Sequence, residues 1–173
     1  MLGLKLMETW VKAPFLKGAS VLIIGECVRS AFPKLWDEFA KNRIALTSCP
    51  QAEGFSGLTE KLATLIKCSS PEEITILSID GSPHCNMLHF SANAASFLTE
   101  TDIPTKHLVI AKEGDIREIS SGTVRLSRYL HLVDKCIQRC PDLIDDLGSL
   151  SLEHKSAEKR RSPCPMIHDG SEA

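Results

Sequence analysis

Two kinds of hydrophobic pattern alternate along the chain. Short runs rich in Val, Ile and Leu predict buried strands, whereas longer stretches with an apolar residue at every third or fourth position predict helices. The strand-like runs are 19–25, 43–48, 73–79 and 106–111, with a short edge strand at 116–119, and the helical stretches between them are 32–40, 58–67 and 86–99. Strands that alternate with helices form right-handed βαβ units, in which helices cover both faces of a parallel sheet. The pattern therefore predicts an α/β, three-layer Rossmann-like or flavodoxin-like sandwich. Its mostly parallel sheet has 4–5 strands, the first four in the order 2-1-3-4.

The two ends of the chain have patterns of their own. Residues 1–18 carry apolar side chains with helical spacing as far as Pro14, which predicts an N-terminal helix and a connector. The α/β domain then spans 19–147 and ends in a long helix from 123, which Pro141 either kinks or divides. Residues 148–173 are polar and charged, which is typical of a disordered tail.

Composition restricts the classes of partner and compartment. The net charge of −2 gives no electrostatic reason to expect nucleic acid or an anionic membrane as a partner. No apolar run reaches the roughly 18 residues of a membrane-spanning helix, and Lys5 and Glu8 interrupt the apolar start, so a signal peptide is not expected. Seven cysteines, an odd number, favour reduced thiols over a disulfide framework. We therefore expect a cytoplasmic protein.

Three of the cysteines follow three predicted strands. Cys27, Cys49 and Cys85 each come within a few residues of a strand end. The carboxyl ends of parallel strands lie at one edge of the sheet, which is where open α/β sheets bind ligands. The spacing therefore predicts that these thiols share a site at the carboxyl edge.

Two histidines accompany the third cysteine. His84 precedes Cys85, and His89 lies four residues beyond it, on the same face of a helix. Thiolates with an imidazole select zinc or an iron–sulfur cluster over magnesium or calcium. The predicted metal ligands are therefore Cys27, Cys49, Cys85 and either His84 or His89, and the predicted cofactor is an iron–sulfur cluster or zinc. The alternative interpretation is that these cysteines are small buried packing residues.

Other motifs narrow the chemistry. The chain has no Cys-x-x-Cys pair, no Gly-x-Gly-x-x-Gly after its first strand and no Gly-Lys-Ser/Thr phosphate loop. Thioredoxin-like redox chemistry and motif-based binding of a dinucleotide or nucleoside triphosphate are therefore not expected. Cys136 and Cys140 lie one helical turn apart among apolar residues, which predicts that they face a core.

The order of these features resembles a known domain. Over about residues 19–119, a fixed order of short motifs accompanies the predicted strands and helices. The motifs are Cys27, Phe32-Pro33, Cys49-Pro50, Lys61-Leu62-Ala63 and Pro83-x-Cys85. This arrangement is similar to the α/β domain that follows a two-cluster ferredoxin module in poorly characterised iron–sulfur proteins of anaerobic bacteria and archaea. A weaker likeness runs to the [2Fe–2S]-carrying delta subunit of methyl-viologen-reducing hydrogenase. The ferredoxin module is missing, and His84 stands where the first family usually has a second cysteine.

The residues and the resemblance lead to three hypotheses. The first is a redox-associated protein in which Cys27, Cys49 and Cys85 bind a metal or an iron–sulfur cluster, and which acts with a ferredoxin-like or oxidoreductase partner that carries electrons. The second is a non-catalytic accessory or interaction subunit that keeps the fold without the chemistry. The third is a thiol-dependent enzyme with Cys85 as nucleophile and His84 or His89 as base.

Overall fold

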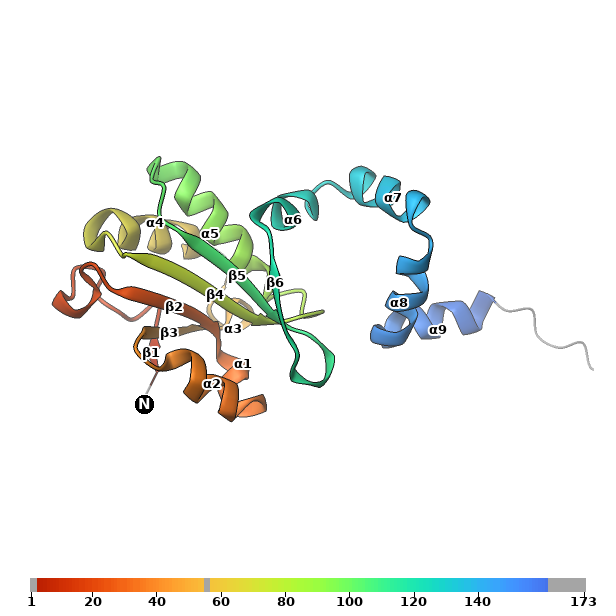
Figure 1. The fold of residues 1–173 in the computed structure, drawn as a ribbon, viewed down its shortest axis with the longest axis horizontal. Coiled ribbons are helices and arrows are strands. Elements are labelled where there is room, and N and C mark those ends of the chain that lie inside the picture. Colours follow the sequence, from red (N-terminus) through yellow and green to blue (C-terminus); the bar gives the residue numbers. More distant parts are fainter. Residues whose placement is uncertain (1–2, 55–56, 162–173) are drawn as a thin grey trace, which may run out of the picture. The chain divides into compact units, whose positions relative to one another are not determined.

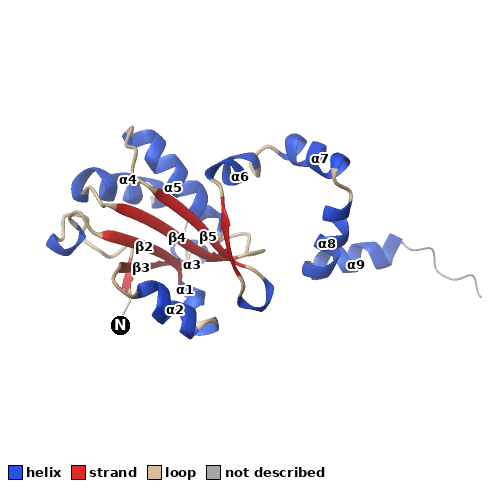
Figure 2. Cartoon of the chain, in the orientation of Figure 1, coloured by secondary structure: helices blue, strands red, loops and turns tan. Residues whose placement is uncertain are grey.

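The structure, a computed structural model, describes residues 3–54 and 57–161. The chain divides into two compact units, the first ending at Leu130 and the second beginning at His131. Figure 1 follows the chain through both units, and Figure 2 marks the helices and strands.

The first unit is built on a six-stranded sheet in the order β1-β3-β2-β4-β5-β6. The strands are β1 (Leu4–Lys5), β2 (Ser20–Gly25), β3 (Ile44–Ser48), β4 (Glu73–Ile79), β5 (Thr105–Ile110) and β6 (Ile116–Ile119). All pairs are parallel except β5 with β6, which is antiparallel. The predicted order of the four central strands and the short edge strand are both confirmed.

Helices cover the two faces of this sheet, which gives the predicted three-layer α/β sandwich (Figure 1). They are α1 (Glu26–Ala31), α2 (Pro33–Ala40), α3 (Pro50–Glu53), α4 (Leu58–Ser69), α5 (Asn86–Thr99) and α6 (Ser121–Leu126), with 3-10 turns η1 (Pro14–Leu16) and η2 (Lys112–Gly114). Successive residues of a strand face opposite sides, so β2 sends Val21 and Ile23 to the core under α4 and α5. Leu22 and Ile24 of the same strand enter the second core, under α1 and α2.

The N-terminal segment differs from the sequence prediction. Residues 4–5 form β1 instead of a helix, and residues 14–16 form η1. The backbone N–H of Leu6 donates to the carbonyl of Thr47 at 2.8 Å, so the segment adds itself to the open edge of β3. Leu6 is then fully buried. Leu4 and Trp10, which also suggested a helix, remain exposed. The pattern misled because a short apolar run fits a helix or an edge strand.

The C-terminal segment also differs. The helix predicted from residue 123 is divided at Pro141, one of the two expected alternatives: α7 (Leu130–Arg139) ends before it, and Pro141 is the N-cap of α8 (Asp142–Leu150). It is also broken at residues 127–129, after α6, which was not predicted. The expected disordered tail contains the end of α8 and α9 (Leu152–Arg161), while residues 162–173 lie outside the described residues. Proline lacks an N–H and clashes with the preceding turn, so it ends α7 and starts the next helix.

Cys136 and Cys140 are exposed, contrary to the prediction, because α7 has no buried residue. Among the described residues, no helix is long and apolar enough to cross a membrane.

Candidate functional site

The strands that precede the three cysteines are neighbours and end at the same edge of the sheet. Gly25, the last residue of β2, pairs with Ser48 at the end of β3, and Ile24 pairs with Leu77 of β4. The loops that follow these strands therefore leave from one edge, as the sequence predicted.

Each cysteine stands at the start of a helix. Cys27 is the second residue of α1, and Cys49 and Cys85 are the N-caps of α3 and α5. The sequence had indicated loops after β2 and β3, and it missed α1 and α3 because each has only six or four residues. A thiolate in the first turn of a helix is stabilised by unpaired backbone N–H groups.

Cys85 reaches back toward β2. A Cβ atom added at Gly25 would lie 3.7 Å from the Cys85 Sγ, which is ordinary van der Waals contact. The sulfur therefore lies close to the end of β2, at a distance that would also accommodate a methyl group at Gly25. Cys27 is exposed, Cys49 and Cys85 are half-buried, and all three are free thiols.

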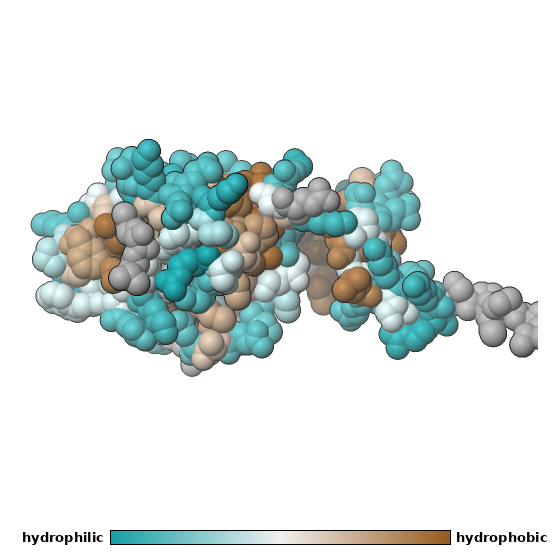
Figure 3. Space-filling model, turned by 90° about the horizontal axis from the view of Figure 1, so that it is seen from below, coloured by the Kyte–Doolittle hydropathy of each residue, from teal (hydrophilic) through white to brown (hydrophobic). Residues whose placement is uncertain are grey.

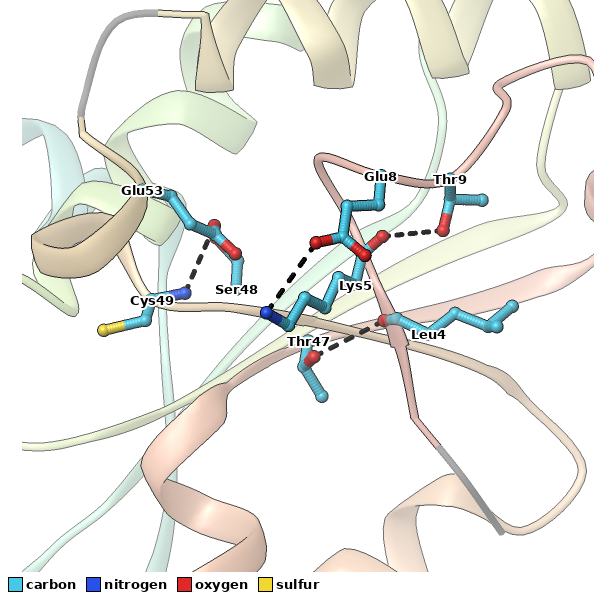
Figure 4. A network of polar contacts seen from close by, with 8 residues as sticks. All are labelled: Leu4, Lys5, Glu8, Thr9, Thr47, Ser48, Cys49 and Glu53. Carbon is cyan, nitrogen blue, oxygen red and sulfur yellow. Dashed lines mark hydrogen bonds and ion pairs between the residues drawn. The ribbon is translucent and has the colours of Figure 1, made fainter.

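A carboxylate fixes the loop of Cys49. The hydroxyl of Ser48 donates to Glu53 Oε2 at 2.7 Å, and the backbone N–H of Cys49 donates to the same oxygen at 3.3 Å. Figure 4 shows the Cys49 sulfur pointing away from this carboxylate. Glu53 thus ties the end of β3 to α3 and leaves the thiol directed elsewhere.

The same figure shows how β1 is held beside this strand end. Thr47 Oγ1 donates to the carbonyl of Leu4 at 3.4 Å, and Thr9 Oγ1 donates to the carbonyl of Lys5 at 2.7 Å (Figure 4). Lys5 Nζ also lies 3.7 Å from Glu8 Oε1. The first contact joins the N-terminal segment to β3, and the other two shape the turn that follows β1.

The metal-ligand set predicted from sequence is not assembled as such. Among the described residues, which include Cys27, Cys49, Cys85, His84 and His89, no group of three or more His, Cys, Asp or Glu side chains is placed to hold a metal ion. The thiols lie in neighbouring loops at one edge, without the convergence of a closed tetrahedral site.

His89 is engaged in the core instead of at the thiol edge. It is only 2% exposed. Its Nε2 lies 2.9 Å from Ser78 Oγ, and its Nδ1 lies 3.0 Å from His107 Nδ1. With both ring nitrogens occupied, His89 offers none to a metal ion or to the Cys85 thiol. His84 is half-buried in the turn before α5, where its carbonyl accepts from the N–H of Met87 at 3.1 Å.

Asn93 fixes the direction of this buried hydrogen-bond chain. Its Nδ2 donates to the carbonyl of Ser121 at 3.4 Å, so its Oδ1, 3.2 Å from His107 Nε2, accepts from that ring. A neutral His107 then accepts at Nδ1 from His89 Nδ1, and His89 Nε2 accepts the Ser78 hydroxyl proton. This series of hydrogen bonds links β4, α5, β5 and the start of α6.

Burial keeps both rings neutral. Desolvation, followed by the charge of His107, lowers the pKa of His89 to about 4. Desolvation also lowers the pKa of His107, with a further contribution from the Arg125 guanidinium. Sequence reasoning missed this cluster, although His89 and Asn93 lie four apart on one helix face and Ser78 and His107 interrupt two apolar strands.

Comparison with known proteins bears on the fold. The model of a family described as "Rossmann-like domain" matches residues 13–163. Neither a curated protein nor a solved structure matches the chain. The match covers most of the sequence, including the whole sheet from β2 onward and the three cysteine loops. The chain therefore belongs to the family of Rossmann-like domains.

Proposed function

We propose that the thiols of Cys27, Cys49 and Cys85 bind a soft metal ion or an iron–sulfur cluster in a redox-associated protein. The observation that carries this proposal is the position of the three residues at the starts of the helices that follow three adjacent parallel strands, with the Cys85 sulfur close to Gly25 of β2. Thiolates are the ligands that zinc, copper(I) and iron–sulfur clusters prefer, and none of the three is in a disulfide.

The donors fit a soft metal in kind, whereas the described residues contain no preformed group of three. Cys27 is exposed on the short helix α1, so its side chain is free to turn toward the other two loops. A partner protein could supply the metal ligands that this chain lacks. We therefore include in the proposal a ferredoxin-like or oxidoreductase protein that docks on the carboxyl edge and exchanges electrons there.

Metal analysis and a visible absorption spectrum of anaerobically purified protein test the proposal. We expect bound zinc or iron, and its loss in Cys49→Ser and Cys85→Ser, because a hydroxyl is a hard and weak ligand. The matched control is Cys68→Ser. Cys68 is an exposed thiol near the end of α4. This end of α4 lies at the opposite edge of the sheet, because the carbonyl of Ser69 accepts from the N–H of Gly18, just before β2 begins. A colourless, metal-free protein, or retention of metal in the double variant of Cys49 and Cys85, would contradict the proposal.

A second candidate is an accessory or interaction subunit. The helices α7 and α8 have no buried residue, and the exposed leucines of the second unit include Leu143, Leu147, Leu150 and Leu152. Figure 3 shows hydrophobic residues at the surface of this unit. Exposed apolar side chains of this kind are typical of protein–protein contacts. The same metal analysis separates the candidates, since a metal-free protein favours the accessory role.

A further inference from the structure

A pocket of about 320 Å³ lies beside the thiol edge, between α5 and α6. Asp80 and Asn86, which line it, flank the loop that carries Cys85, so the pocket and the thiols share the connection from β4 to α5. The sulfur of Cys85 approaches Gly25 on one side of this loop, whereas the pocket extends to β5 and β6 on the other. It is therefore a site separate from the three thiols.

The body of the pocket is apolar. Its walls include Phe90 of α5, Val109 of β5, Ile119 of β6 and Val124 of α6. His89 also lines it, but both of its ring nitrogens are occupied by Ser78 and His107, so it presents a ring without a free polar atom. A ligand body that enters this space meets hydrocarbon and aromatic surface, which favours an apolar or aromatic group.

One carboxylate supplies the charge at this pocket. Asp80 is exposed, and its Oδ1 accepts from the N–H of Gly81 at 3.0 Å. Among the described residues, its Oδ2 accepts no hydrogen bond and Asp80 forms no ion pair. The other polar lining groups, Asn86, Thr123 and Ser127, are neutral.

Two cations lie nearby without lining the pocket. The Arg128 guanidinium stands 6.0 Å from the ring centroid of Phe90, and Arg125 acts on the buried His107. Asp80 is therefore the acidic residue among those that line the pocket, and its carboxylate attracts a positive charge.

We infer that this pocket binds a small primary amine with an apolar or aromatic body, with its ammonium group on Asp80. A volume of about 320 Å³ lies at the lower end of the range for small-molecule sites, which suits a single ring with a short chain and is too small for a dinucleotide. The inference does not rest on the metal site, because neither Asp80 nor the pocket walls belong to the proposed ligand set.

The test is a titration of the ¹⁵N-labelled full-length chain, followed by two-dimensional NMR at neutral pH. The two probes are tyramine and 3-(4-hydroxyphenyl)propionate, which share the ring and differ in the sign of the charged end. We expect saturable shifts with tyramine, centred on the amides of Asp80, Asn86 and Phe90, and weaker binding of the propionate.

Three variants assign the binding. Asp80→Asn keeps the oxygen that accepts from Gly81 and removes the charge, so tyramine should bind roughly fivefold more weakly, as expected for a partly exposed ion pair. Ser127→Trp places a bulky side chain at an exposed lining position and should block both probes. The matched control is Asp37→Asn, an exposed carboxylate on α2, which covers the other face of the sheet.

Equal affinity for the two probes, unchanged tyramine binding in Asp80→Asn, or no saturable shift at these amides would overturn the inference. Each of these results is independent of metal content, so failure here and failure of the thiol proposal are distinguishable.

Discussion

The Nδ1 atoms of His89 and His107 face each other at 3.0 Å in the core of the first unit. A single N–H between them satisfies both nitrogens. The pair can take up a further proton only if the hydrogen bond to Ser78 reverses, so that His89 Nε2 donates to the Ser78 oxygen. With both rings charged, two N–H groups would point at each other in a site of low dielectric. The doubly charged state of this pair is therefore incompatible with the folded structure.

The folded state should lose stability as the pH falls. The pKa of His89 is lowered from 6.5 to about 4 in the fold. Between these two pH values the unfolded chain therefore binds a proton on His89 that the folded chain does not bind. The stabilisation is complete above pH 6.5 and declines between about pH 6.5 and pH 4, by roughly 3 kcal/mol for this one group. Urea unfolding at a series of pH values measures the slope. His89→Asn should flatten it, even if the variant is less stable throughout.

The imidazole resonances give a direct check of the same prediction. The ring carbon-bound protons of His89 should keep the chemical shifts of a neutral ring at pH 5.5. Titration of His89 near pH 6.5 would contradict the assignment of a buried neutral pair.

The central sheet could be predicted from the sequence because its strands are buried on both faces. Such strands form nearly continuous apolar runs, as in 21–24 and 74–77, and the helices between them fix the parallel order. The shared edge of Cys27, Cys49 and Cys85 followed from that order alone.

The position of each side chain at the edge could not be predicted in the same way. His89 was assigned to the thiols because of its spacing from Cys85, yet its helix turns the ring inward to Ser78 and His107, which come from other strands. Contacts between residues 11 and 18 positions apart depend on how α5 is rotated against the sheet. The rotation of α5 about its axis cannot be read from a single sequence.

Removal of the Thr75 hydroxyl should stabilise the protein. The residue lies in the central strand β4 and is 1% exposed, and its Oγ1 has no hydrogen-bond partner among the described residues. Thr75→Val keeps the shape and removes a polar group that is buried without compensation, so we expect about 1 kcal/mol of added stability. The control is Thr47→Val in β3. Thr47 is equally buried, but its hydroxyl donates to Leu4, so this change should not stabilise. Chemical denaturation of the two variants measures the contrast, and a loss of stability in Thr75→Val would mean that the hydroxyl has a partner.

The N-terminal segment should depend on Lys61 of α4. The Lys61 Nζ donates to the carbonyls of Met7 at 3.2 Å and Thr9 at 2.6 Å, across more than fifty positions of sequence. It thereby satisfies backbone acceptors in the turn that follows β1 and lets Leu6 stay in the core. Lys61→Met keeps much of the side-chain length and removes the donor, so it should cost about 1–3 kcal/mol, the usual range for losing hydrogen bonds from a charged group.

Lys67→Met, at an exposed position of the same helix, is the matched control and should change stability by less than about 0.5 kcal/mol. Hydrogen exchange adds a local readout, because the N–H of Leu6 donates to Thr47 in the pairing of β1 with β3. In Lys61→Met this amide should exchange faster while the amides of β2 keep their protection. Equal protection of Leu6 in the two variants would show that the edge strand is held by the sheet alone.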